Sequence, residues 1–343
     1  MASPPWARLQ REEHKASSSA SSPVVSLRSS LPDLSVRWEA RIKERLPFQY
    51  VVGIAHWRRV TLAVGSGVLC PRPETEQLVD LAAAAFREMA KAEKDSSSSS
   101  SPSLSSLPWA DLGTGSGAIA VGLALDALVV SSGGGRGNGD GDGDDASTSS
   151  SPSASFPSTR PPRVFAVDAS PLAASWARLN VSRLNLENRV TVLEGSWLEP
   201  VFEERGKEAR TGNSAPSSLP SSSPFSSSSS KEAFLAGVVS NPPYIPRSQL
   251  ATLQREVRDH EPSLALDGGA GAGLDSLRPL CASAARALAC GGFLALETAG
   301  KEQASEVASD LLEGSGFFED VHVHEDLFGV ARFVTATRKR REE

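Results

Sequence analysis

The four residues Asn241-Pro242-Pro243-Tyr244 combine hydrogen-bond acceptors with a flat aromatic surface. Asn241 offers a side-chain carbonyl, while Pro242 offers a main-chain carbonyl, has no N–H, and fixes φ with its ring. Tyr244 adds the aromatic face. Two acceptors beside such a face suit a planar NH2 group that is to be alkylated. Asn-Pro and Pro-Pro are equally typical of an ordinary turn after a strand, so the tetrad alone leaves both interpretations open.

A second candidate site is a glycine-rich loop that follows a short apolar run at residues 107–112. Asp111 lies near the end of this run, and Gly113-Thr114-Gly115-Ser116-Gly117 comes next. Glycines let the backbone approach a ligand closely, and the N-terminus of the helix that follows favours an anionic group. The G-x-G-x-G spacing differs from the G-x-G-x-x-G of dinucleotide binders. Asp168 ends the next strand, where it can bind ribose hydroxyls. Loop and acid together favour an adenosine-containing cofactor over a purely structural turn.

Strands and helices alternate around these two motifs. Ser170 and Pro171 are typical of the N-cap and first position of a helix, and Gly291-Gly292 is expected to join a helix at about 274–289 to a fifth strand. This alternation predicts an α/β fold with a doubly wound, mostly parallel sheet. Both motifs then fall at the carboxyl ends of strands, where such sheets bind ligands. The apolar runs that predict buried strands are residues 107–112, 163–167, 189–193, 234–239 and 293–297.

Three low-complexity segments contain too few apolar residues to enter a core. We interpret residues 96–106, 131–162 and 206–231, which are rich in Ser, Pro, Gly or Asp, as disordered inserts. Without the middle insert, the glycine loop and Asp168 are separated by close to the ~20 residues expected of a nucleotide site. The remainder suits one α/β domain within residues 71–343, preceded by a small N-terminal piece at 31–70.

The charge and cysteine content narrow the classes of partner. A formal net charge of −6 argues against extensive binding to phosphates, which requires clustered Lys and Arg, and the Arg338-Lys339-Arg340-Arg341 run is more typical of a solvated tail. Cys70, Cys281 and Cys290 lack the spacing of a metal site. No apolar run approaches the length of a transmembrane helix. We therefore expect a monomer with no metal, no direct nucleic-acid partner and no membrane contact.

Taken together, the glycine loop, Asp168 and the tetrad resemble class I S-adenosylmethionine-dependent methyltransferases, and the tetrad is similar to that of enzymes that methylate planar amino groups. Two further segments resemble the PrmC/HemK family of release factor glutamine N5-methyltransferases. One is PFQYVVG at 47–53 with GVLCPRPETE at 67–76, and the other is Glu261-Pro262 with ALDGG at 265–269. The resemblance implies a Rossmann-like sheet of seven strands, with a reduced N-terminal helical segment and a linker β-hairpin within residues 31–70.

The resemblance also implies the ligands and the roles of the site residues. S-adenosylmethionine is the implied cofactor, and the glutamine of the Gly-Gly-Gln loop of a class 1 peptide chain release factor is the implied substrate. Trp197 would lie against adenine, with simple core packing as an equal alternative. The implied cofactor site comprises Asp111, Gly113, Thr114, Gly115, Ser116, Gly117, Asp168, Trp197 and Asn241. The implied catalytic residues are Asn241, Pro242 and Tyr244, and the implied substrate contacts are Asn241, Pro242, Pro243, Tyr244, Arg72, Glu74 and Thr75.

Two other functions remain as alternatives. A nucleic-acid methyltransferase acting on the amino group of adenine or guanine uses the same tetrad, but it needs a basic face. The acidic charge and the PRPETE sequence at 71–76 count against it. A catalytically silent S-adenosylmethionine-binding protein would keep the same fold. The intact tetrad, glycine loop and Asp168 count against that alternative.

The N-terminal segment bears on localisation. Residues 1–30 are rich in Ser and carry Arg8, Arg11 and Arg28, as in a transit peptide, whereas the acidic pair Glu12-Glu13 is atypical of one. A disordered tail is an equal alternative. PFQY at 47–50 looks most like plastid-type family members, so we expect a chloroplast protein, with mitochondrion or cytoplasm as alternatives.

Overall fold

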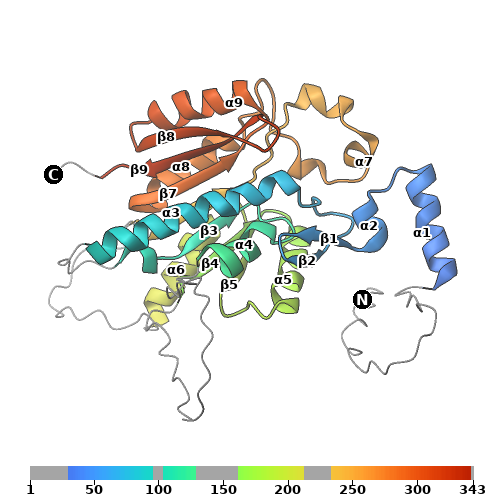
Figure 1. Ribbon diagram of the computed structural model, residues 1–343, viewed down its shortest axis with the longest axis horizontal. Helices are drawn as coiled ribbons and strands as arrows, with labels where there is room; N and C mark the ends of the chain where they lie inside the picture. Colours follow the sequence, from blue (N-terminus) through green and yellow to red (C-terminus); the bar gives the residue numbers. More distant parts are fainter. Residues whose placement is uncertain (1–29, 96–102, 129–160, 212–232, 341–343) are drawn as a thin grey trace, which may run out of the picture.

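The computed structural model describes residues 30–95, 103–128, 161–211 and 233–340 (Figure 1). The expected tail at 1–30 therefore lies outside the described residues, apart from Ser30. Most of the three expected inserts also lies outside them, at 96–102, 129–160 and 212–232.

One sheet of seven strands forms the centre of the molecule, in the order β5-β4-β3-β6-β7-β9-β8 (Figure 1). The first five strands in this order are parallel, and β9 pairs antiparallel with β7 on one side and with β8 on the other. The predicted mostly parallel, seven-stranded sheet is thus confirmed. The strands are β3 (Trp109–Leu112), β4 (Val164–Asp168), β5 (Val190–Glu194), β6 (Leu235–Ser240), β7 (Leu288–Glu297), β8 (Phe318–Glu325) and β9 (Ala331–Arg338).

The connection expected at Gly291-Gly292 is part of β7 instead. This strand begins at Leu288, which pairs with Leu235, and the register shifts before Phe293 pairs with Gly237. The two glycines therefore lie at an irregularity in the strand. The preceding helix α8 (Leu277–Ala287) ends directly before β7 begins. Glycine is common at such irregularities because it tolerates the altered backbone.

Helices cover both faces of the sheet, as a doubly wound fold requires (Figure 1). On one face, Leu78 and Phe86 of α3 (Glu76–Asp95) join Ile119 of α4 (Ala118–Gly122) in a buried cluster that includes Trp109. The π-helical turn η4 (Leu123–Ala127) continues α4, and α5 (Pro171–Arg183) adds Val181. Since β3 is buried along its whole length, its neighbouring residues contribute to two separate cores.

The opposite face carries the second core cluster. Leu277 and Leu280 of α8 pack there with Ala304 of α9 (Lys301–Glu306) and Val201 of α6 (Glu199–Thr211). A second π-helical turn, η7 (Val307–Glu313), follows α9. The strands contribute alternate residues to the two faces, so Leu112 belongs to this cluster while Trp109 belongs to the first.

The helix predicted after Asp168 begins as its sequence indicates. The Ser170 hydroxyl accepts a hydrogen bond from the Ala173 N–H at 3.3 Å, and Pro171 occupies the first helical position. The N–H groups of a first helical turn have no partner within the helix. The Ser170 hydroxyl supplies a partner for one of them, and Pro171 has no N–H. This cap fixes the chain as it leaves β4 at the edge where ligands bind.

The N-terminal piece consists of two helices and a hairpin. Within the segment 31–70, residues 47–53 form α2 (Phe48–Val52) and its cap, where Gly53 adopts a φ of 77° and donates its N–H to Gln49 O at 2.8 Å. This left-handed glycine ends the helix. The hairpin follows as β1 (Ile54–Trp57) and β2 (Val60–Ala63). The remaining helix, α1 (Leu31–Lys43), lies at the edge of the molecule and has no buried residue (Figure 1).

Two of the expected inserts are shorter than the sequence suggested. Ser103 and Ser105 both donate to the Glu93 carboxylate, and a 3-10 turn η3 (Leu104–Ser106) forms there. Residues 206–211 extend α6 by a further turn, because Lys, Glu, Ala and Arg within them are good helix formers. The first difference comes from hydrogen bonds to Glu93 and the second from helix propensity.

Short turns and one short helix complete the described residues. They are η2 (Pro73–Thr75), η5 (Arg247–Thr252), α7 (Arg255–Arg258) and η6 (Ser263–Ala265). Within the described ranges, no helix combines the length and the apolarity needed to cross a membrane.

We predict that Gly237→Ala destabilises the fold by about 1–3 kcal/mol, because overpacking forces a buried side chain out of place. A Cβ at this position in β6 would lie 2.2 Å from the fully buried ring of Trp109. Urea unfolding measures the change. Gly206→Ala in α6 is the matched control, since its Cβ would meet nothing within 4 Å. Equal stability of the two variants would contradict the packing argument.

Candidate active site

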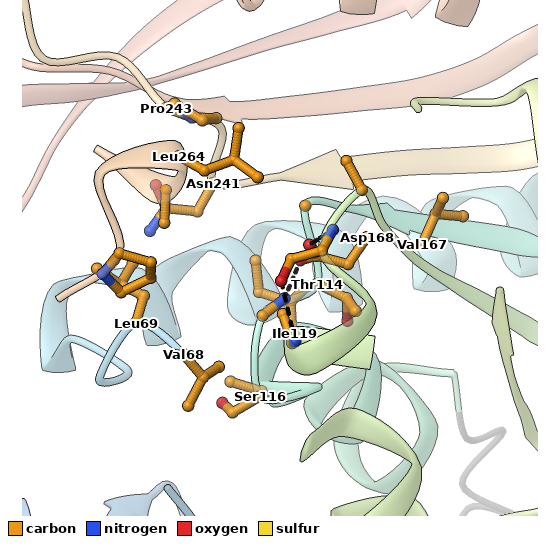
Figure 2. Close-up of a pocket in the computed structure, with 18 of the residues that line it drawn as sticks. Val68, Leu69, Thr114, Ser116, Ile119, Val167, Asp168, Asn241, Pro243 and Leu264 are labelled. Carbon is orange, nitrogen blue, oxygen red and sulfur yellow. Dashed lines mark hydrogen bonds between the residues drawn. The ribbon is translucent and has the colours of Figure 1, made fainter. Parts of the chain in front are cut away.

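A cavity of about 280 Å³ opens at the carboxyl ends of β3, β4 and β6. Its walls come from the loops after these strands and from the segment between β2 and α3. Figure 2 shows Asn241, Pro243 and Leu264 on one side of the cavity, and Thr114 and Asp168 across from them. The two candidate sites identified from the sequence are therefore parts of one cavity.

The glycine loop has a backbone that only glycine adopts readily. Gly113, Gly115 and Gly117 have φ values of 74°, 57° and 85°. The N–H groups of Gly113 and Thr114 both donate to Val167 O at 2.9 Å, which ties the loop to the end of β4. A Cβ on Gly115 would have Val68 as its nearest neighbour, at 3.9 Å. The loop therefore leaves open space on its cavity side.

Asp111 lies beneath this loop and is fully buried. Its Oδ2 accepts from the Thr114 hydroxyl at 2.5 Å and from the Ala120 N–H at 2.9 Å, whereas Oδ1 has no partner among the described residues. Burial raises the pKa of this carboxyl to about 7. Asp111 does not line the cavity. Its position indicates that it shapes the loop from below.

Asp168 lines the cavity and holds two backbone segments. Its Oδ2 accepts from the Gly115 N–H and its Oδ1 accepts from the Ser170 N–H, both at 2.8 Å (Figure 2). Burial raises the pKa of Asp168, and the two backbone hydrogen bonds oppose that rise. A carboxylate has about four lone-pair positions, so two remain to accept from ligand hydroxyls.

In the tetrad, the amide of Asn241 is oriented by Thr75. The Asn241 Nδ2 group donates to Thr75 Oγ1 at 3.2 Å, so Oδ1 is the atom that remains to accept from a ligand. Asn241 and Pro243 line the cavity, whereas Pro242 is buried and Tyr244 lies behind the lining. The Tyr244 hydroxyl donates to Glu297 Oε1 at 3.0 Å, and burial strongly raises its pKa.

The ALDGG motif at 265–269 holds the segment that follows the tetrad. The Ile245 N–H donates to Leu266 O at 3.0 Å, and the Gly268 N–H donates back to Ile245 O at 2.9 Å. A Cβ on Gly268 would lie 2.6 Å from the Tyr244 carbonyl carbon, which requires glycine at this position. Gln303 Nε2 also donates to Tyr244 O at 2.9 Å. The motif at 265–269 therefore fixes the backbone of the tetrad.

The substrate-facing loop expected from the sequence is only partly at the cavity. Arg72 and Thr75 line it, but Glu74 does not. Arg72 forms an ion pair with Glu261 at 2.6 Å, and the Glu261 side chain is only 1% exposed. Tyr50 of α2 donates to Val68 O at 2.5 Å and so attaches the N-terminal piece to the cavity wall. These contacts bring the segments at 47–53, 67–76 and 261–262 together in the folded chain.

Trp197 has two kinds of neighbour. It lines the cavity and also packs against the second core cluster. Its φ is 48°, and Gly195, two residues earlier, has a φ of 144°, so this stretch turns sharply after β5.

Sequence reasoning missed two residues with direct contacts to the site. Glu297 ends β7 beside the tetrad and was noted only as the end of a strand. Its place at a strand end is the same signal that identified Asp168. Gln303, which holds the Tyr244 carbonyl, lies in α9, and nothing in its sequence context indicates this contact.

Comparison with known proteins places this geometry in a family. No family model matches the chain. The release factor glutamine methyltransferase of Thermosynechococcus vestitus is 33% identical over 317 residues, covering 92% of this chain and 82% of that protein. Those of Gloeobacter violaceus (35% over 301 residues, 88% and 78%) and Deinococcus radiodurans (33% over 310 residues, 90% and 81%) match similarly. The chain belongs to the release factor glutamine methyltransferase family.

Among solved structures, the hMettl16 catalytic domain is 10% identical, covers 91% of this chain and 82% of its own, and has a TM-score of 0.48. Membership of the release factor glutamine methyltransferase family confirms the resemblance seen in the sequence and its cofactor, S-adenosylmethionine. The residues present fit that cofactor. The positive-φ glycines leave a cradle open above Gly115, and Asp168 has lone pairs for ribose hydroxyls. Trp197 adds an aromatic wall.

We predict that Asp111→Asn makes stability less dependent on pH. The Asp111 pKa is about 7 in the folded chain and 3.8 in the reference state, so between these values the folded protein binds one more proton than the unfolded chain. The free energy of unfolding of the wild type should therefore fall, relative to Asp111→Asn, as pH rises from 4 to 7 (roughly the span of the two pKa values), and level off above it. Urea unfolding of both proteins without cofactor measures this difference, and parallel curves would contradict the burial argument.

Proposed function

We propose that this chain transfers a methyl group from S-adenosylmethionine to the side-chain nitrogen of the glutamine in the Gly-Gly-Gln loop of a class 1 peptide chain release factor, in support of translation termination. The observation that carries the proposal is the adjacency of the two motifs. A Cβ placed on Gly113 of the glycine loop would lie 3.6 Å from the main-chain oxygen of Asn241. The cradle for the methyl donor and Asn241, which offers an acceptor for an NH2 group, therefore meet in one cavity.

The side chains at the cavity indicate catalysis by positioning. A glutamine amide is a poor nucleophile because its lone pair is delocalised, and S-adenosylmethionine supplies a methyl group on a positively charged sulfur. Among the described residues that line the cavity there is no His, Cys or Lys to act as a strong base. Asn241 Oδ1 and the Pro242 carbonyl would accept the two amide N–H groups. They would thereby aim the nitrogen at the methyl group and stabilise the positive charge that develops on it.

The charges near the cavity favour a protein substrate over a nucleobase. Two arginines in the segments that flank the tetrad each form an ion pair with an acidic partner. Arg72 pairs with Glu261 at 2.6 Å, and Arg247 pairs with Asp267 at 2.8 Å. A nucleic-acid methyltransferase needs free cations for phosphate binding. Family membership points the same way and also counts against a silent cofactor-binding protein.

We also propose that the protein acts as a monomer in the chloroplast. The composition of residues 1–30 and the plastid-type form of PFQY at 47–50 support this location. A fluorescent protein fused behind residues 1–30 and imaged in plant cells tests it. Accumulation in mitochondria or cytoplasm would support one of the other two locations instead.

The substrate is tested by incubating the protein with labelled cofactor and a recombinant organellar release factor. We expect label on the wild-type factor and none on the factor with Gln→Ala in its Gly-Gly-Gln loop. The Gln→Ala change removes the side-chain amide and with it the acceptor nitrogen. Label transfer to the Gln→Ala factor would contradict the proposal.

We predict that Asn241→Ala lowers kcat by about 100-fold or more while the Kd of S-adenosylmethionine stays near that of the wild type. Removing one preorganised group that stabilises developing charge typically has an effect of this size. Methyl-transfer kinetics and calorimetric binding measure the two quantities. Asp168→Ala is the contrasting variant, because it should lose cofactor binding. Equal loss of cofactor binding in both variants would show that Asn241 does not act as a substrate clamp.

A further inference from the structure

A buried carboxylate lies directly behind the tetrad. Glu297 ends β7, between β6 and β9 in the sheet, and is 1% exposed. Two hydroxyls donate to it, the Thr75 hydroxyl to Oε2 at 2.7 Å and the Tyr244 hydroxyl to Oε1 at 3.0 Å. Glu297 does not line the cavity, so any effect on a substrate passes through these two residues.

The hydrogen bonds from Glu297 have a defined direction. Oε1 and Oε2 of Glu297 each accept from a hydroxyl, so the single proton of the Thr75 hydroxyl is donated to Oε2. The Thr75 oxygen can then only accept from Asn241, and it does so from Nδ2 at 3.2 Å. The nitrogen edge of the Asn241 amide is thereby turned toward Thr75, and Oδ1 is turned away from it.

This direction determines what the clamp can bind. An asparagine amide rotated by half a turn would present NH2 in place of its oxygen, and two NH2 groups cannot hydrogen-bond to each other productively. The correct orientation is set by whichever neighbour fixes the donor and acceptor edges. Here that neighbour is Thr75, and its own polarity is set by Glu297.

We propose that Glu297 is a positioning residue for methyl transfer, which holds Asn241 Oδ1 toward the substrate amide through Thr75 and holds the Tyr244 ring through its hydroxyl. This inference rests on the proposed function. Glu297, at the end of β7, would thus orient Asn241, which follows the end of β6. It also links the loop before α3 to the tetrad, because Thr75 belongs to η2.

The surroundings of Glu297 argue against a purely structural role. Burial raises its pKa, and among the described residues it has no direct ion pair, since the nearby Arg332 pairs with Asp326 at 2.8 Å. Glu74 opposes its ionisation further. A buried carboxylate of this kind costs stability, and an apolar side chain would cost less. The benefit of Glu297 is that it defines the direction of the hydrogen bonds from the two hydroxyls.

The test compares kcat, KM and cofactor Kd for Glu297→Gln, Thr75→Val, Thr75→Ser and the Glu297→Gln/Thr75→Val double variant. Thr75→Val removes the hydroxyl at nearly constant volume, and Thr75→Ser restores it. Glu93→Gln is the matched control, because Glu93 also accepts from two hydroxyls, those of Ser103 and Ser105 near the far end of α3.

We expect Glu297→Gln and Thr75→Val each to lower kcat roughly 10- to 100-fold, as for loss of a hydrogen bond to a charged group. Cofactor Kd should be unchanged, Thr75→Ser should recover most of the kcat that Thr75→Val loses, and Glu93→Gln should keep kcat within a small factor of the wild type. The double variant should be no slower than the slower single variant, because both substitutions break one chain of hydrogen bonds. Wild-type kcat in either single variant, or effects that multiply in the double variant, would overturn the proposal.

A second readout needs no substrate and separates this inference from the proposed function. The side-chain NH2 resonances of Asn241 are assigned by their loss in Asn241→Asp. They should shift in Thr75→Val and in Glu297→Gln, and stay in place in Thr75→Ser and Glu93→Gln. If the wild type methylates no release factor, the proposed function fails and these spectra still decide the role of Glu297. If Glu297→Gln does not fold, Thr75→Val against Thr75→Ser decides it, and unshifted resonances overturn it.

Discussion

The parallel register of β4, β3 and β6 is the constraint on which the site depends. Leu112 at the end of β3 pairs with Val167 on one side and with Ser240 on the other. The next residues along each strand are therefore the glycine loop, Asp168 and Asn241, all leaving the sheet at the same edge. Backbone pairing alone brings together groups that are far apart in the sequence, and the buried central strands keep this edge rigid.

Three buried carboxylates then hold three different loops against this edge. Asp111 holds the glycine loop through Thr114, Glu261 holds the segment before α3 through Arg72, and Glu297 holds Thr75 and Tyr244. Burial raises the pKa of all three. Burying a carboxylate is unfavourable unless it is well hydrogen-bonded, so each one strongly specifies the conformation of the loop that donates to it.

Much of the fold could be predicted because its central strands are buried on both faces and read as short apolar runs. β6, which is buried at every residue, is an example, and the Ser170-Pro171 start of α5 is a local signal of the same kind. The support of the site could not be predicted in this way. Thr75 meets Glu297 across 222 positions of sequence, and Arg72 meets Glu261 across 189. Such partners meet only in the folded chain, so the periodicity of apolar residues does not predict them.

The gaps between the described ranges have one topological property in common. Each one begins after a helical segment on the way back to the sheet, at Asp95, Leu128 and Thr211, and the chain then enters β3, β4 and β6. The described residues that lead into these strands, 103–108, 161–163 and 233–234, lie at the amino ends of the strands, opposite the edge where the cavity lies. They contain none of the residues that line the cavity. The architecture thus separates the connections that lead into the strands from the loops that carry the site.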